Sequence, residues 1–217
     1  MLVIAGCVAL VALGIALVVQ RGGGAREDEP HMEWPRYVAV SLGAGLAAGV
    51  LAAGAGGRLM MRLLGATSPD VHGLTTEAGE IIGEITLGGT LAFLVFVGLP
   101  AGFLSGGLYA LVAPLLPSGR ARGVALGVLL LVLFATRIDP LRADSIDFLL
   151  LEPAWLAVLG FSALALLQGM LVAALAPPPK PVARSRVLIA GRIALAVVVL
   201  AALPGFIGAT ADILSGV

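Results

Sequence analysis

The chain has 217 residues, of which 59% are hydrophobic and 12% charged, with 13 basic and 13 acidic side chains. Soluble chains are about half apolar and about a quarter charged. This composition, with a mean hydropathy of +1.08, therefore excludes an ordinary soluble domain. The chain has one cysteine and two histidines, and none of the three lies in the middle of a late apolar stretch. This excludes a disulfide framework, a Cys/His zinc site and a bis-histidine haem site. The sequence predicts an all-α integral membrane protein.

Uncharged stretches alternate with charged segments and predict a bundle of about six transmembrane helices in a single domain, residues 1–217. A spanning helix needs about 20 apolar residues. We expect the spans at residues 2–20, 37–57, 85–114, 121–137, 153–176 and 190–211, with outer loops at 58–84 and 138–152. The fourth span is the shortest. Its uncharged stretch, residues 123–136, also fits a re-entrant or buried helix.

The third apolar stretch is too long for a single crossing. Residues 75–114 could form one helix, which at 1.5 Å per residue would reach about 60 Å against a hydrocarbon core of about 30 Å. We expect Thr75 or Thr76 to cap its start, because threonine accepts hydrogen bonds from the first turn of a helix. Part of this helix must then bend or lie outside the membrane.

Basic residues predict the orientation, because Lys and Arg are retained on the cytoplasmic side. The first, third and fifth connecting segments hold nine of them, whereas the second and fourth hold four. Both termini and the two outer loops are therefore expected outside.

Twelve of the 13 basic residues are Arg and Asn is absent, which indicates a GC-rich bacterial genome. We expect a multi-pass protein of the bacterial inner membrane.

Small residues recur at every fourth position in two of the spans. The helix-packing residues that we single out are Gly45, Gly49, Gly57, Gly98, Gly102 and Gly106. Ser41 and Ala53 extend the series in the second span. Such faces let helix backbones approach closely in lipid, so they predict a compact bundle. The alternative is that these glycines are hinges or line a substrate path, and Pro100 within the third span is its best support.

One concentrated group of charged residues lies in the two expected outer loops. This candidate polar cluster comprises Arg58, Arg62, Glu77, Glu80, Glu84, Asp139 and Asp147. One interpretation is a structural clasp, in which arginines and glutamates fix the register of neighbouring helices. The other is an entrance for an ion or small solute, because ionisable groups at membrane depth are expensive and commonly mark a pathway. Glu84 is the deepest candidate.

Enzymatic interpretations lack essential partners. Residues 102–106 read Gly-Phe-Leu-Ser-Gly, but activation of Ser105 would need a base, and no histidine or lysine lies in a later span. There is no H-E-x-x-H motif and no Walker loop. We expect no enzyme activity, no cofactor, no metal and no nucleic-acid partner. An arginine-and-carboxylate enzyme acting on a lipid head group is the remaining enzymatic alternative.

Three segments carry a resemblance to a known group of proteins. They are residues 79–90 (GEIIGEITLGGT), residues 137–140 (RIDP) and the pair Asp147-Phe148. With the apolar runs around them, they resemble small multi-pass membrane proteins of high-GC, actinobacterial-type bacteria over roughly residues 55–175. The resemblance implies a membrane class and no assigned activity or catalytic residue.

The sequence thus predicts a structural, assembly or accessory membrane protein. Its expected partners are the lipid bilayer and either another membrane protein or a second copy of this chain. The alternative function is a small transporter or channel that uses the Arg/Glu cluster in the outer leaflet.

Overall fold

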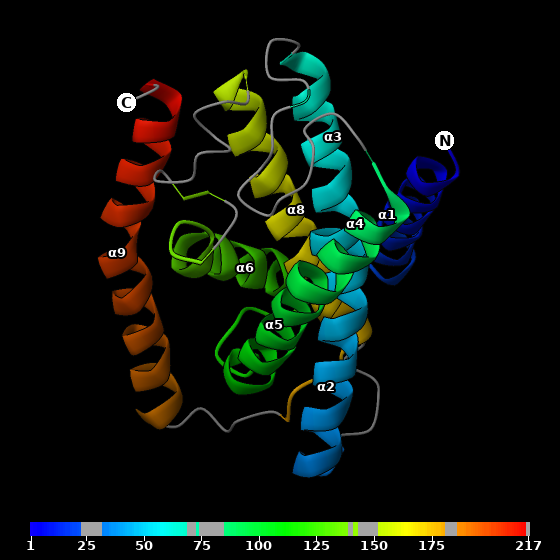
Figure 1. Ribbon diagram of the computed structural model, residues 1–217. Helices are drawn as coiled ribbons and strands as arrows, with labels where there is room; N and C mark the ends of the chain where they lie inside the picture. Colours follow the sequence, from blue (N-terminus) through cyan, green and yellow to red (C-terminus); the bar gives the residue numbers. More distant parts are fainter. Residues whose placement is uncertain are drawn as a thin grey trace.

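The computed structural model describes residues 1–22, 32–68, 73, 85–138, 141–142, 152–180 and 186–215. Within these ranges the protein is all-helical, with 85% of the residues in helices and no strand. This confirms the predicted all-α fold class. The described residues form six continuous helices, and the start of the first and the end of the last both lie in the upper half of Figure 1.

Three of the six helices contain a π-helical segment. The first helix is α1, Leu2–Arg21. The second runs from α2 (Trp34–Ala48) through the π-helical η1 (Gly49–Gly56) to α3 (Gly57–Thr67). The third runs from α4 (Leu87–Phe93) through η3 (Leu94–Gly98) to α5 (Leu99–Val112). The fourth joins α6 (Arg120–Leu130) to η4 (Leu131–Ala135), and α8 (Ala154–Leu175) and α9 (Arg186–Ser215) follow.

Five of these helices are long and apolar enough to cross a membrane. The helix that falls short is α6 with η4, which has 11 and 5 residues. At 1.5 Å per residue it reaches about 24 Å, less than the hydrocarbon core of about 30 Å. In Figure 1 it also lies at a steep angle to α9. The sixth crossing therefore stays a prediction.

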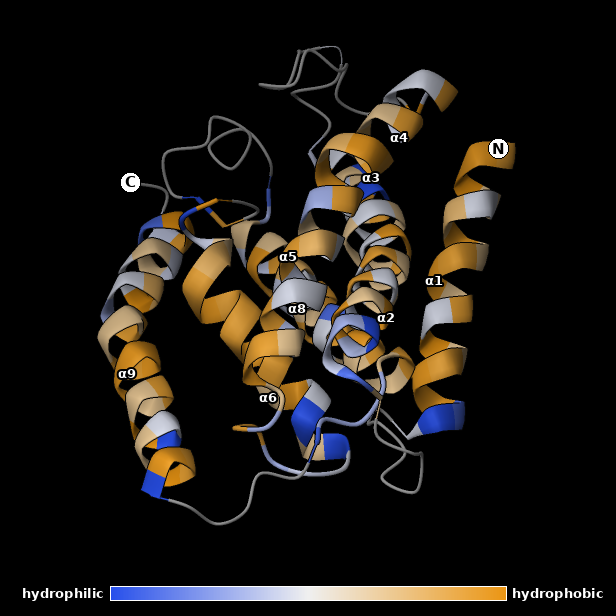
Figure 2. Ribbon diagram, turned by 90° about the horizontal axis from the view of Figure 1, so that it is seen from below, coloured by the Kyte–Doolittle hydropathy of each residue, from blue (hydrophilic) through white to orange (hydrophobic). Residues whose placement is uncertain are grey.

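The two ends of the bundle differ in charge. We call them the Arg21 end, where α1 ends and α9 begins, and the Met1 end, where α1 begins and α9 ends. Figure 2 shows hydrophilic residues at the end of α1 and at the starts of α6 and α9, with largely hydrophobic helices between the two ends. Arg120 and Arg186 are the first residues of α6 and α9. This band between polar ends suits a lipid bilayer.

Local capping sets the start of the third helix. Thr86 is extended, and its hydroxyl oxygen accepts a hydrogen bond from the Gly89 N–H at 3.0 Å. The predicted continuous helix over residues 75–114 is therefore wrong, because Ile85 and Thr86 are not helical. The predicted caps Thr75 and Thr76 lie outside the described residues.

The second helix continues beyond its predicted end. We expected the outer loop to begin at residue 58, but α3 remains helical through Thr67. The arginines that marked the boundary are accommodated within the helix, because Arg58 is buried and Arg62 half-buried. Long basic side chains can cover apolar surface with their stems while their charged heads find polar surroundings. A charge is therefore a poor marker of where this helix ends.

Glycines bring the second and third helices into backbone contact. A methyl group on Gly45 would lie 2.6 Å from the Gly106 Cα, and one on Gly49 would lie 2.6 Å from the Gly102 Cα. Both methyl groups would also meet backbone carbonyl oxygens of the third helix, those of Gly102 and Gly98. Five of the six predicted helix-packing glycines therefore meet across one helix pair. Gly57 instead faces a side chain, because a methyl group on it would lie 2.9 Å from the ring of Phe93.

The π-helical segment η1 shifts the register of this contact. The four-residue spacing in the sequence assigned Ala53 to the packing face, but Ala53 lines a cavity. Gly54 meets the third helix in its place, because a methyl group on Gly54 would lie 3.6 Å from the Gly98 Cα. A π-helix bonds residue i to residue i+5 and so adds a residue to the turn. The packing face therefore moves by one position beyond Gly49.

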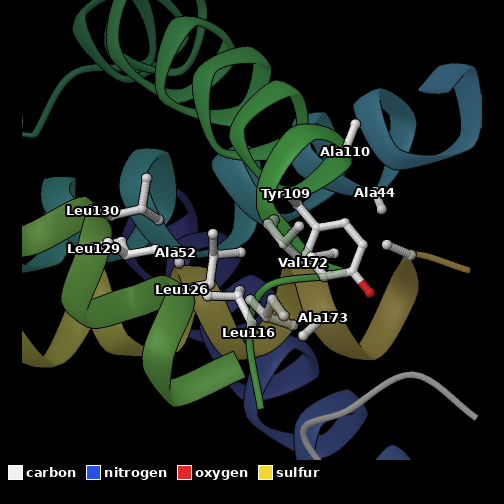
Figure 3. Close-up of a cluster of buried hydrophobic side chains, with 14 of the residues drawn as sticks. Ala44, Ala52, Tyr109, Ala110, Leu116, Leu126, Leu129, Leu130, Val172 and Ala173 are labelled. Atoms are coloured by element: carbon white, nitrogen blue, oxygen red, sulfur yellow. The ribbon is translucent and has the colours of Figure 1, made fainter. Parts of the chain in front are cut away.

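Two apolar clusters form the core. The larger, which we call the Arg21-side cluster, includes Ala48, Tyr109, Leu126 and Leu171, all fully buried. Figure 3 shows the Tyr109 ring within this cluster among side chains such as Ala44, Leu116 and Val172. The smaller, which we call the Met1-side cluster, comprises Met60, Leu64, Ala135, Leu141, Ala157, Phe161 and Ile213. Together they occupy both ends of the bundle interior.

We expect opposite effects from the same substitution at two glycines of α2 and η1. Gly49→Ala should lower the stability by roughly 1–3 kcal/mol, the usual cost of overpacking, because its methyl group meets backbone that cannot move aside. Gly43→Ala is the matched control, since nothing lies within 4 Å of its added methyl group. It should be neutral or raise stability by up to about 1 kcal/mol, because alanine favours a helix over glycine. Unfolding in detergent measures both, and equal tolerance would contradict this packing.

Candidate functional site

The predicted polar cluster is described only at its arginines. Glu77, Glu80, Glu84, Asp139 and Asp147 lie outside the described residues. Arg58 is 7% exposed and interacts electrostatically with Cys7 of α1. Arg62 lies one turn further along α3 and is half-buried. The pairing of these arginines with glutamates therefore stays a prediction.

A cavity of about 560 Å³ lies within the bundle and is the candidate functional site. Four helices line it: the second at η1 and α3, the third at α4, η3 and α5, the fourth at α6 and η4, and α8. This volume is within the range of pockets that bind small molecules, about 300–1,000 Å³. The residues that line it are Ala53, Gly57, Phe93, Phe96, Val97, Pro100, Ala101, Leu104, Leu130, Phe134, Ala135, Ile138, Phe161, Leu164, Ala165 and Gln168.

The cavity wall is apolar and rich in aromatic rings. Gln168 is the single polar side chain among the lining residues. Four of the seven phenylalanines in the chain contribute to the wall: Phe93, Phe96, Phe134 and Phe161. Water is poorly held by such a wall, because a buried water needs two to four polar partners. The wall therefore suits an apolar occupant.

The cavity opens sideways. Phe96 is 77% exposed, Ile138 is 60% exposed and Pro100 is also exposed, although all three line the cavity. Phe96 belongs to η3, Pro100 to α5 and Ile138 to the turn after η4. In a bilayer this surface of the bundle faces lipid. Pro100, which the sequence offered as support for a substrate path, thus lies at the mouth.

All three π-helical segments contribute to the cavity. Ala53 belongs to η1, Phe96 and Val97 to η3, and Phe134 and Ala135 to η4. π-Helices are rare and occur frequently at functional sites. Because η1 and η3 also carry Gly49, Gly54 and Gly98 of the helix contact, these two segments lie where the glycine face and the cavity wall meet.

Gln168 and Ser105 form a polar pair beside the cavity. The Gln168 side-chain amide donates to the Ser105 Oγ at 2.9 Å and to the Ala101 carbonyl oxygen at 3.4 Å. The Ser105 hydroxyl in turn donates to the Gly102 carbonyl oxygen at 3.0 Å. Both side chains are buried. Ser105, considered in the sequence as a nucleophile, is thus a link between α5 and α8.

Sequence reasoning missed Gln168, although a signal was present. It is one of two glutamines in the chain and lies within an otherwise apolar span. The candidate functional groups were chosen among charged side chains, and an amide carries no charge. Polar amides inside membrane spans form interhelical hydrogen bonds, so this residue could have been singled out.

A second polar group lies at the Arg21 end. The Tyr109 hydroxyl donates to the Pro177 carbonyl oxygen at 3.3 Å, and Arg122 interacts electrostatically with Tyr109 and Tyr37. Arg21 donates to the Ala174 carbonyl oxygen at 3.2 Å. These contacts hold the end of α8, whose last carbonyl groups have no partner within the helix. We interpret this group as structural.

Comparisons with known proteins add no functional assignment. No protein-family model, curated protein or solved structure matches the chain. Within the described ranges, no group of three or more His, Cys, Asp or Glu residues could hold a metal ion. The cavity is therefore the feature of the described residues from which a function can be inferred.

The polar pair predicts a measurable coupling between α5 and α8. Ser105→Ala and Gln168→Leu should each destabilise the protein, and the double variant should lose less than the sum of the two. Hydrogen bonds between membrane helices average about 0.6 kcal/mol and reach about 1.7 kcal/mol, so we expect a coupling energy in this range. Unfolding in bicelles measures this coupling energy.

The control combines Gln168→Leu with Thr210→Ala. The Thr210 hydroxyl bonds within α9, so the effects of these two substitutions should be additive. Additivity for both pairs would refute the link.

Proposed function

We propose that this chain is an accessory protein of the bacterial inner membrane that binds an apolar molecule from the bilayer in its lateral cavity. The observation that carries the proposal is a cavity of about 560 Å³ with an apolar wall and an exposed edge at Phe96, Pro100 and Ile138. The resemblance to small multi-pass proteins of high-GC bacteria is compatible with this function and assigns no other.

The size of the cavity supports an occupant. The cavity has a volume of about 560 Å³, and apolar side chains that border empty space lack the dispersion contacts that a neighbour would give them. An apolar molecule in the cavity supplies those contacts. The open side admits molecules dissolved in the membrane.

A small transporter that uses the Arg/Glu cluster is the second candidate. The observation that favours it is Arg58, which is buried in α3 and precedes Thr67, the last residue of that helix, by nine positions. Charges at membrane depth commonly mark a pathway. The two candidates differ in one respect, because a transporter moves its ligand across a vesicle membrane whereas an accessory protein binds it without flux.

We further propose that the Met1 end faces the outside and the Arg21 end the cytoplasm. The support is the excess of basic residues in the segments at the Arg21 end, because Lys and Arg are retained on the cytoplasmic side. The same argument places both termini outside if all six helices cross. Candidate partners remain the bilayer and either another membrane protein or a second copy of this chain.

Cysteine accessibility should report this topology. In a Cys7→Ala background, Ser118→Cys and Ser215→Cys place single thiols on exposed residues at the Arg21 and Met1 ends. A maleimide that cannot cross membranes should label intact cells at position 215 and not at position 118. Labelling of neither position before lysis, and of both after it, would mean that the fourth helix does not cross and that the chain has five spans.

Filling the cavity should abolish binding. Ala165 lines the cavity, whereas Ala163, two residues earlier on α8, is exposed on the bundle surface. In lipid nanodiscs, cyclohexylbenzene should raise the melting temperature of the wild type and of Ala163→Phe but not of Ala165→Phe, in which the new ring occupies the site. An equal response of the two variants would show that the probe binds elsewhere, and the proposed function would then fail.

A further inference from the structure

We infer that the occupant of the cavity is a membrane-soluble phenol or quinol, an apolar molecule with an aromatic hydroxyl group that donates a hydrogen bond to Gln168. This inference rests on the proposed function and deepens it, because it names the chemical class of the ligand. Two independent features of the cavity support it, an amide oxygen that needs a donor and a wall of aromatic rings.

The orientation of the Gln168 amide is fixed by its partners. Its nitrogen donates to the Ala101 carbonyl oxygen, which can only accept. The Ser105 hydroxyl proton is already donated to the Gly102 carbonyl oxygen, so Ser105 accepts from the amide and cannot donate to it. The other end of the amide, Oε1, is buried and has no hydrogen-bond partner among the described residues. This oxygen is thus left as an acceptor.

The position of Gln168 makes this acceptor costly. The residue is 4% exposed and precedes Leu175, the last residue of α8, by seven positions, about 10 Å along the helix. Inside the hydrocarbon core an unsatisfied polar group costs several kcal/mol. Gln168 lines the cavity, so an occupant that approaches this side chain can bring the donor that Oε1 lacks among the described residues. An alkyl chain of a phospholipid has no donor at this depth.

The aromatic wall favours a ring over a linear chain. The ring of Phe93 lies 2.9 Å from the position of a methyl group on Gly57, and both residues line the cavity. Aromatic rings attract one another in offset or edge-to-face arrangements beyond what the burial of their area contributes. A flat ring with one hydroxyl group therefore satisfies both the wall and Gln168.

The test compares two probes that differ in the hydroxyl hydrogen. 4-Cyclohexylphenol can donate to Oε1, whereas its methyl ether, 4-cyclohexylanisole, cannot. A net hydrogen bond contributes about 0.5–1.5 kcal/mol, so the wild type should bind the phenol about 2- to 13-fold more tightly in nanodiscs. Gln168→Met should lose this preference and still bind the ether. Thr210→Ala, which removes a hydroxyl that bonds within α9, is the control and should keep the preference.

A spectroscopic measurement on the wild type removes any dependence on how the variants fold. The chain has two glutamines, Gln20 and Gln168, so ¹³C labelling of the glutamine side-chain carbonyl gives two signals, and Gln20→Ser assigns them. The Gln168 signal should shift with the phenol in the direction of a new hydrogen bond and stay in place with the ether.

The outcomes separate this inference from the proposed function. If the wild type binds both probes equally and the Gln168 signal does not respond to the phenol, the ligand class is wrong while the binding function stands. The same conclusion follows if Gln168→Met retains the preference for the phenol. If the wild type binds neither probe nor cyclohexylbenzene, the proposed function itself fails.

Discussion

The backbone contact between the second and third helices is the constraint on which the rest of the bundle depends. Gly45 and Gly49 lie against Gly98, Gly102 and Gly106 with no side chain between the helix axes. In lipid there is little hydrophobic drive between helices, so van der Waals contact at this distance must supply much of the association energy. Larger side chains are thereby placed on the flanks of the pair, where they form the two apolar clusters and the wall of the cavity.

The sequence predicted the helical class and about six spans, and five of the helices are long and apolar enough to cross a membrane. These features were predictable because apolar length and charge placement act locally along the chain. It did not predict the π-helical segments, which depend on how helices meet. The series from Gly45 to Gly57 illustrates the limit. A four-residue spacing assigns Ala53 to the packing face, whereas η1 turns Ala53 into the cavity and brings Gly54 to the third helix. A single added residue in a turn changes every later contact.

The candidate site was harder to predict than the fold, for a physical reason. Charge is the most visible sign of function in an apolar sequence, and it led to the Arg/Glu cluster, of which the structure describes Arg58 and Arg62. The cavity is built almost entirely from Phe, Leu, Ala and Gly, which are also the ordinary residues of any membrane helix. Only the three-dimensional arrangement distinguishes the ones that surround a space, and Gln168 was the single local signal.

The position of the cavity between the two apolar clusters favours binding over conduction. On α8 the lining residues run from Phe161 to Gln168, and the fully buried Leu171 of the Arg21-side cluster follows them. Toward the Met1 end, the Met1-side cluster packs Ala157 of the same helix against Met60 and Leu64. An ion that crossed the bundle would have to pass both clusters, which are apolar except for the hydroxyl groups of Tyr37 and Tyr109. An apolar molecule needs to pass only the exposed edge at Phe96 and Ile138. Packing at both ends and access from the side are the features that a site for a membrane-dissolved ligand requires.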